Sequence, residues 1–213
     1  MLSDVLLIAE KHEKAGKFIA ERILKERKDN KKFIVAISGE SGSGKSELTH
    51  VVAKEMRKAG LVGKPLHIDN YYKTKPRERQ EWRKKNGVES VGFGEYDWDT
   101  INRNISEFRN GEKATMPCVD IATDMVDTLI TDFAPVDVLI VDGLYAIKTE
   151  DIDLKVFIEL TYHETKKAQH ARGKEVVNDF RMQVLEQEHQ AVQTLKSSSD
   201  IFVGMDYVAY NAK

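Results

Sequence analysis

The chain has 213 residues, of which 33 are lysine or arginine and 35 are aspartate or glutamate, so its formal net charge is −2 at pH 7. This length favours one main domain, and the near balance of charge excludes a general field for binding nucleic acid or a membrane surface. The single cysteine, Cys118, excludes an intrachain disulfide, and we expect a protein of the reducing cytoplasm.

The first predicted element is an amphipathic helix from Ser3 to about Lys28, within an N-terminal helical segment of residues 1–30. Its apolar residues recur at steps of three or four and are Val5, Ile8, Ala15, Ile19 and Ile23, with His12 a weaker member. A hydrophilic stretch, Lys25–Lys32, separates this helix from a single domain of residues 31–213. The apolar stretch Val5–Ala9 is too short for a signal peptide or a membrane span.

Short apolar runs predict four buried strands. They lie at Phe33–Ser38, Pro65–Ile68, Asp137–Asp142 and Leu154–Leu160. Helical periodicity predicts helices at Lys45–Ala59 and Asp99–Asn110, each followed by a glycine. A small antiparallel hairpin is predicted from Met116–Ala122 and Val126–Thr131. The alternation of strands and helices favours an α/β fold, a parallel sheet with helices on both faces that binds ligands at the carboxyl ends of its strands.

A glycine-rich loop, Gly39–Ser46 (GESGSGKS), follows the first predicted strand and opens a helix. Its spacing matches the phosphate loop GxxxxGK[ST], in which backbone N–H groups and a helix N-terminus surround phosphate oxygens. We expect Lys45 to reach the β- and γ-phosphates of ATP and the Ser46 hydroxyl to bind Mg²⁺. The residues predicted to bind phosphate are Gly39, Glu40, Ser41, Gly42, Ser43, Gly44, Lys45, Ser46 and Glu47.

Two aspartates follow predicted strands and would emerge beside this loop. Asp142 ends an apolar strand, where its carboxylate is placed to bind Mg²⁺ directly or through water, and a turn cap before Gly143 is the alternative. Asp69 follows the strand after the loop's helix, where a general base would take the proton of an acceptor hydroxyl. A helix or turn cap is the alternative for Asp69.

Four stretches together resemble the uridine kinase and phosphoribulokinase family of P-loop kinases, from about Phe33 to Tyr207. They are GESGSGKS at 39–46, HIDNYYK at 67–73, EYDWD at 95–99 and VLIVDGLYAI at 138–147. The resemblance implies a kinase that uses ATP and Mg²⁺ to phosphorylate a hydroxyl group of a small molecule. It also implies that Asp69 is the catalytic base, that Tyr72 lies against the acceptor and that Asp97 binds the acceptor's hydroxyls. An ordinary helix cap is the other interpretation of Asp97.

The family also carries a basic lid that closes over the phosphates, and residues from about 163 to 180 stand in its place. The basic residues there are Lys166, Lys167, His170, Arg172 and Lys174. Lysines lack the planar fork of arginine, so we expect this lid to stabilise the transferring phosphoryl group less well. A solvated helix face is the alternative.

The acceptor segment departs from the uridine kinase pattern. Val119 and Asp124 stand where those enzymes have a tyrosine and a histidine, so the edge that would read a pyrimidine is altered. The stretch Lys73–Lys85 holds seven basic and two acidic residues. It is either a solvated helix or part of an acceptor site that favours an anion such as a sugar phosphate.

The phosphate loop is compatible with three classes of function, which the rest of the sequence favours to different degrees. A small-molecule kinase accounts for Asp69 and Asp142 together with the phosphate loop. A nucleotide-binding module without transfer would account for the altered acceptor segment but not for both acids. A GTPase-type switch is the least favoured of the three, because the chain contains no Asn-Lys-x-Asp segment of the kind that reads guanine. The expected partners are ATP and a small acceptor, and a homo-oligomer is left open.

Overall fold

Six strands form the central sheet of the computed structural model, which describes residues 5–28, 31–165 and 178–212. In order across the sheet they are β2 (Gly63–His67), β5 (Val138–Asp142), β1 (Phe33–Gly39), β6 (Leu154–Ile158), β7 (Ile201–Val203) and β8 (Ala209–Asn211). The strands from β2 to β7 are parallel, and β8 runs antiparallel to β7. The predicted parallel sheet is confirmed, and its carboxyl-end edge carries the candidate site.

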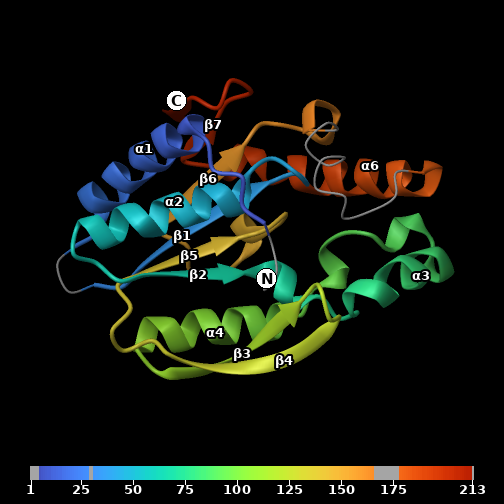
Figure 1. Ribbon diagram of the computed structural model, residues 1–213, viewed down its shortest axis with the longest axis horizontal. Helices are drawn as coiled ribbons and strands as arrows, with labels where there is room; N and C mark the ends of the chain where they lie inside the picture. The colour runs from blue at the N-terminus through green and yellow to red at the C-terminus, as the bar shows by residue number, and fades with distance from the viewer. Residues whose placement is uncertain (1–4, 29–30, 166–177, 213) are drawn as a thin grey trace.

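Helices cover both faces of this sheet (Figure 1). They are α1 (Glu10–Glu26), α2 (Lys45–Lys58), α3 (Pro76–Asn86), α4 (Trp98–Asn110) and α6 (Asp179–Gln193). Helices α1 and α2 share one core with the sheet, and α4 and α6 contribute to the other. Helix α3 stands apart from both cores and buries only Arg83.

Strand β1 feeds both cores because successive side chains of a strand point to opposite faces. Ile34 and Ala36 join the core under α4, whereas Val35 and Ile37 join the core under α1 and α2. All of β1 is buried, as is all of β5 beside it. The loop that follows β1 therefore starts from a fixed position in the middle of the sheet.

The predicted hairpin forms a separate sheet of two strands, β3 (Lys113–Asp120) and β4 (Met125–Asp132). It lies below α4 in Figure 1, and its tip approaches α3. Strand β3 is half buried against α4, whereas nearly every residue of β4 is exposed. The hairpin is longer than its sequence pattern indicated.

The first helix begins at Glu10, and the predicted start at Ser3 is wrong. Residues 5–9 lie outside the helix, and Val5 is 67% exposed although the periodicity placed it on the buried face. The helix starts here because Ala9 has an extended backbone and its N–H donates to His12 Nδ1 at 2.9 Å. This local cap, which the periodicity does not reveal, decides where the helix begins.

Candidate active site

The phosphate loop joins β1 to α2 at the carboxyl end of β1. Gly42 and Gly44 have φ of 80° and 93°, a backbone conformation that side chains disfavour. A Cβ atom on Gly44 would also collide with the Tyr207 hydroxyl, which donates to the Gly44 carbonyl at 3.1 Å. The loop therefore requires these glycines, and it presents the N-terminus of α2 to an anion.

Among the predicted phosphate-binding residues, the side chains differ in where they point. Lys45 Nζ donates to the carbonyl of Glu40 at 2.8 Å, so it lies along the loop. Ser46 is half buried in the first turn of α2. The Glu47 carboxylate accepts from the N–H of Leu7 at 3.3 Å, and this contact turns it toward the N-terminal segment. The Glu40 carboxylate likewise contacts other protein groups, so we expect Glu40 and Glu47 to contact phosphate through their backbone N–H groups.

Asp142 ends β5 beside His67, which ends β2 at the same register position. The carboxylate is 3% exposed, and its Oδ1 lies 2.6 Å from His67 Nδ1. Its Oδ2 is buried without a hydrogen-bond partner among the described residues. Thr49 and Lys45 lie near enough to this carboxylate to lower its pKa, but neither makes a hydrogen bond of ordinary geometry with Oδ2. An anionic oxygen beside the phosphate loop suits a hard cation such as Mg²⁺.

The electrostatics of this pair keep Asp142 charged. Burial by itself would raise the pKa of Asp142, but the charge of His67 and its hydrogen bond outweigh burial, and the pKa lies below its ordinary value. The Asp142 carboxylate in turn raises the pKa of His67, which burial only partly offsets. A buried carboxylate that stays ionised is what metal coordination requires.

Asp69 lies in η1 (Ile68–Tyr71), the single turn that follows β2. Its Oδ1 accepts from the Tyr96 hydroxyl at 3.4 Å, and the side chain is half buried. The turn approaches β5 closely, because a Cβ atom on Gly143 would collide with Ile68. Strands β2 and β5 are neighbours, so the structure brings Asp69 and Asp142 together at adjacent strand ends.

Tyr72 follows this turn and packs between an aromatic ring and a cation. Its ring centroid lies 4.1 Å from that of Tyr96, which also contacts Asp69. On the other side, the guanidinium carbon of Arg79 lies 3.3 Å from the Tyr72 centroid. The Nε atom of Arg79 is buried and has no hydrogen-bond partner among the described residues. A charged donor group thus lies close to Tyr72.

Asp97 caps the N-terminus of α4, where its Oδ1 accepts from the N–H of Thr100 at 3.1 Å. Burial would raise the pKa of Asp97, but the hydrogen bonds from Thr100 outweigh it and the pKa is lowered. The N–H of Asp97 also donates to the carbonyl of Tyr71 at 2.9 Å, which places Asp97 beside the Asp69 turn. The structure shows the cap, and contact with acceptor hydroxyls stays a prediction.

The hairpin residues in the altered acceptor segment make contacts within the protein. Asp124 lies at the hairpin tip with φ of 59°, and its Oδ1 accepts from the N–H of Arg77 in the first turn of α3 at 3.1 Å. Val119 is buried, and its N–H donates to the Asn70 side chain at 3.4 Å. These contacts fasten the hairpin to α3 and to the Asp69 turn.

A buried ion pair in α3 is missed by sequence reasoning. Arg83 donates to both carboxylate oxygens of Glu95, at 2.6 and 2.9 Å, and lies 3.2 Å from Glu188 of α6. All three side chains are less than 10% exposed. Within the basic stretch Lys73–Lys85, the letters alone do not separate Arg83 from its exposed neighbours. The solvated-helix interpretation is therefore wrong for Arg83, and Arg79, whose Nε is buried against Tyr72, departs from it in part.

The predicted lid residues Lys166, Lys167, His170, Arg172 and Lys174 lie outside the described residues. The described chain ends before them in a helical turn, residues 162–165, and resumes at residue 178. No described helix has the length and apolar character needed to cross a membrane.

Comparison with known proteins adds to this geometry. The sequence model of the Phosphoribulokinase / Uridine kinase family matches residues 34–172 of this chain. A uridine kinase of Staphylococcus aureus strain JH9 is 27% identical over 187 residues, which span 80% of this chain and 86% of the relative. The family match begins at residue 34, so it leaves out α1.

Two solved structures share the fold. D-glycerate 3-kinase from Cryptococcus neoformans var. grubii has a TM-score of 0.63 at 13% identity and covers 96% of this chain and 99% of its own. Phosphoribulokinase from Rhodobacter spheroides has a TM-score of 0.60 at 12% identity, covering 82% of this chain and 70% of its own. At these identities the likeness concerns the arrangement of strands and helices.

Proposed function

This chain belongs to the phosphoribulokinase and uridine kinase family of small-molecule kinases, and we propose that it transfers the γ-phosphoryl group of ATP to a hydroxyl group of an anionic small molecule. The observation that carries the transfer is that the phosphate loop, Asp142 and Asp69 follow three neighbouring strands, β1, β5 and β2. A triphosphate held by the loop amides would then point its γ-phosphate toward an acceptor beside Asp69.

Each group has a separate part in the proposed reaction. Asp69 accepts the proton of the attacking hydroxyl, and Lys45 holds the β- and γ-phosphates. Ser46 and Asp142 would hold Mg²⁺, which when bound neutralises charge on the phosphate oxygens. Tyr72 forms the wall of the acceptor site, and Asp97 offers a second carboxylate near the same turn.

An anionic acceptor is favoured over a pyrimidine nucleoside by two features. Arg79 presents a guanidinium group whose buried Nε has no partner among the described residues, and such a group pairs with phosphate or carboxylate oxygens. Asp124 and Val119, which occupy the pyrimidine-reading positions of uridine kinases, are engaged in contacts with α3 and the Asp69 turn. Sugar phosphates and hydroxy acids carry the required charge.

The test is release of ADP from Mg·ATP with a panel of acceptors: uridine, cytidine, pantothenate, glycerate and pentose phosphates. We expect one of the anions to stimulate ADP release well above the rate without acceptor. Stimulation by uridine alone would contradict the anionic class and leave the kinase reaction standing. If no acceptor stimulates release although ATP binds, the chain is a nucleotide-binding module and the proposal is wrong.

Arg79→Gln tests the acceptor class more directly. We expect the KM for the anionic acceptor to rise about 10- to 100-fold with kcat little changed, because a charge-assisted hydrogen bond is lost. Arg77→Gln is the matched control, since Arg77 lies on the same helix, is exposed, and uses its backbone N–H for the contact with Asp124. Equal effects of the two variants would mean that general positive charge, and not Arg79, attracts the acceptor.

A further inference from the structure

The phosphate loop contains a buried carboxylate that phosphate binding does not explain. Glu40 is 2% exposed, although the loop holds phosphate through its backbone amides. A carboxylate buried beside an anion site is unfavourable unless its own hydrogen bonds stabilise it. The partners of Glu40 therefore indicate why it is there.

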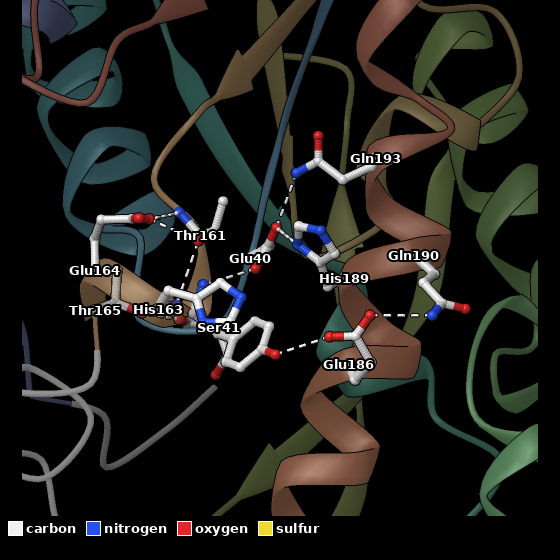
Figure 2. Close-up of polar contacts among 11 residues, drawn as sticks. Glu40, Ser41, Thr161, His163, Glu164, Thr165, Glu186, His189, Gln190 and Gln193 are labelled. Carbon is white, nitrogen blue, oxygen red and sulfur yellow. Dashed lines mark hydrogen bonds and ion pairs between the residues drawn. The ribbon is translucent and has the colours of Figure 1, made fainter.

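Both oxygens of Glu40 are bonded to other elements of the fold (Figure 2). Oε2 accepts from the N–H of Tyr162 at 2.7 Å, just beyond β6. Oε1 lies 2.6 Å from His189 Nδ1 and accepts from Gln193 Nε2 at 2.9 Å, and these two side chains lie one turn apart on α6. Glu40 thus joins the loop to α6 and to the chain leaving β6.

Two further contacts connect the same three segments. The Thr165 hydroxyl donates to the carbonyl of Ser41 at 2.9 Å, one residue beyond Glu40 in the loop. The Tyr162 hydroxyl donates to Glu186 of α6 at 2.8 Å. In Figure 2, Glu186, His189 and Gln193 of α6 lie on one side of Glu40, and Thr161, Glu164 and Thr165 lie on the other.

Helix α6 continues from Glu40 to the acceptor side of the site. Glu188, adjacent in sequence to the histidine that contacts Glu40, lies 3.2 Å from Arg83, and Arg83 holds Glu95 at 2.6 Å. The next residue, Tyr96, donates to Asp69 at 3.4 Å. Polar contacts therefore connect the phosphate loop to the predicted base, joined through the backbone where His189 follows Glu188 and where Tyr96 follows Glu95.

We infer that Glu40 is a positioning residue that holds α6 at a fixed place relative to the phosphate loop, and through α6 sets the acceptor side relative to the nucleotide. This role rests on the proposed function, because phosphoryl transfer requires the reacting oxygen within about 3–3.5 Å of the phosphorus. Helix α6 contacts Glu40 on the nucleotide side and Arg83 on the acceptor side. Binding of nucleotide to the loop should then be felt at residues 83–97.

Hydrogen–deuterium exchange with the non-hydrolysable analogue Mg·AMPPNP tests this without knowledge of the acceptor. In the wild-type chain we expect the analogue to slow exchange at residues 39–48 and, by about fivefold or more, at residues 83–97. In Glu40→Gln we expect slowing at the loop alone, because the amide cannot accept at both ends. Calorimetry should show a Kd for AMPPNP within about threefold of wild type, since the loop amides remain.

Two further variants separate positioning from a general structural effect. Glu186→Gln is the matched control: it alters α6 beside Tyr162 but leaves the bonds of Glu40, so nucleotide should still slow exchange at residues 83–97. Glu188→Gln breaks the contact between α6 and Arg83 and should give the same result as Glu40→Gln. This second variant also keeps the test available if Glu40→Gln does not fold.

The inference is overturned if the slowing at residues 83–97 is absent in wild type or survives in a folded Glu40→Gln or Glu188→Gln. Failure of every acceptor to be phosphorylated would contradict the proposed reaction and leave this result unchanged.

Discussion

The phosphate loop and the acceptor side lie at neighbouring strand ends but are assembled differently. The loop is one continuous segment between β1 and α2, and its shape depends on its own glycines. The acceptor side joins α3, the hairpin and the segment before α4 through side chains, as in the contacts of Asp124 with Arg77 and of Arg83 with Glu95. Nucleotide binding is therefore a local property of the sequence, whereas acceptor selection depends on segments that meet only in the folded chain.

The largest expected effect is a loss of catalysis on the acceptor side that leaves ATP binding on the phosphate side nearly unchanged. Asp69→Asn should lower kcat by about 10²- to 10⁴-fold, because the amide cannot take the proton of the acceptor hydroxyl. The Kd for ATP should stay within a few-fold of wild type, since Asp69 acts on the acceptor. Steady-state kinetics and calorimetry on the same preparation measure the two quantities.

Lys45→Ala is the matched variant on the phosphate side. Loss of its ammonium group should raise the Kd for ATP by about 10- to 100-fold, because a charge-assisted contact to the phosphates is removed. If Asp69→Asn weakened ATP binding as much as Lys45→Ala, the division into a donor and an acceptor side would be wrong.

The second prediction concerns how the acceptor side is held together. Arg83→Met should lower the free energy of unfolding by about 3–5 kcal/mol, because Glu95 would remain buried without its cation and Glu188 would keep only the longer contact with Arg181, at 3.6 Å. Lys84→Met on the same helix removes an exposed pair with Glu81 and should cost no more than about 1 kcal/mol. Urea unfolding followed by circular dichroism compares the two. Equal effects would mean that the Arg83 pair contributes no more than a surface contact.

The phosphate side was predictable because its signals are short in range. The apolar run of β1 and the spacing of glycines before Lys45 place the loop from consecutive residues alone. Asp69 and Asp142 were found in the same way, since each follows a strand whose apolar run ends at it or next to it. Their predicted roles in proton transfer and metal binding stay predictions.

The acceptor side was less predictable because its contacts join residues far apart in the sequence. Arg83 looks like its basic neighbours in α3 and is distinguished only by Glu95 and Glu188, which other segments supply. Helix α6 and the short strands β7 and β8 were not predicted, and three-residue strands are too short to show a period. The contacts of Glu40 with α6 were not predictable either, because they join residues 149 and 153 positions apart in the sequence.

The smallest expected effect lies where the hairpin meets α3. Asp124→Ala should lower the free energy of unfolding by about 1–2 kcal/mol, because it removes the acceptor for the Arg77 N–H and places alanine at a φ of 59°. Asp124→Asn keeps an acceptor oxygen and tolerates this backbone, so its stability should stay within about 0.5 kcal/mol of wild type. Urea unfolding measures both, and the acceptor panel should give the same preference as wild type. A change of acceptor preference at unchanged stability would mean that Asp124 reads the acceptor, and the hairpin tip would then belong to the binding site instead of its scaffold.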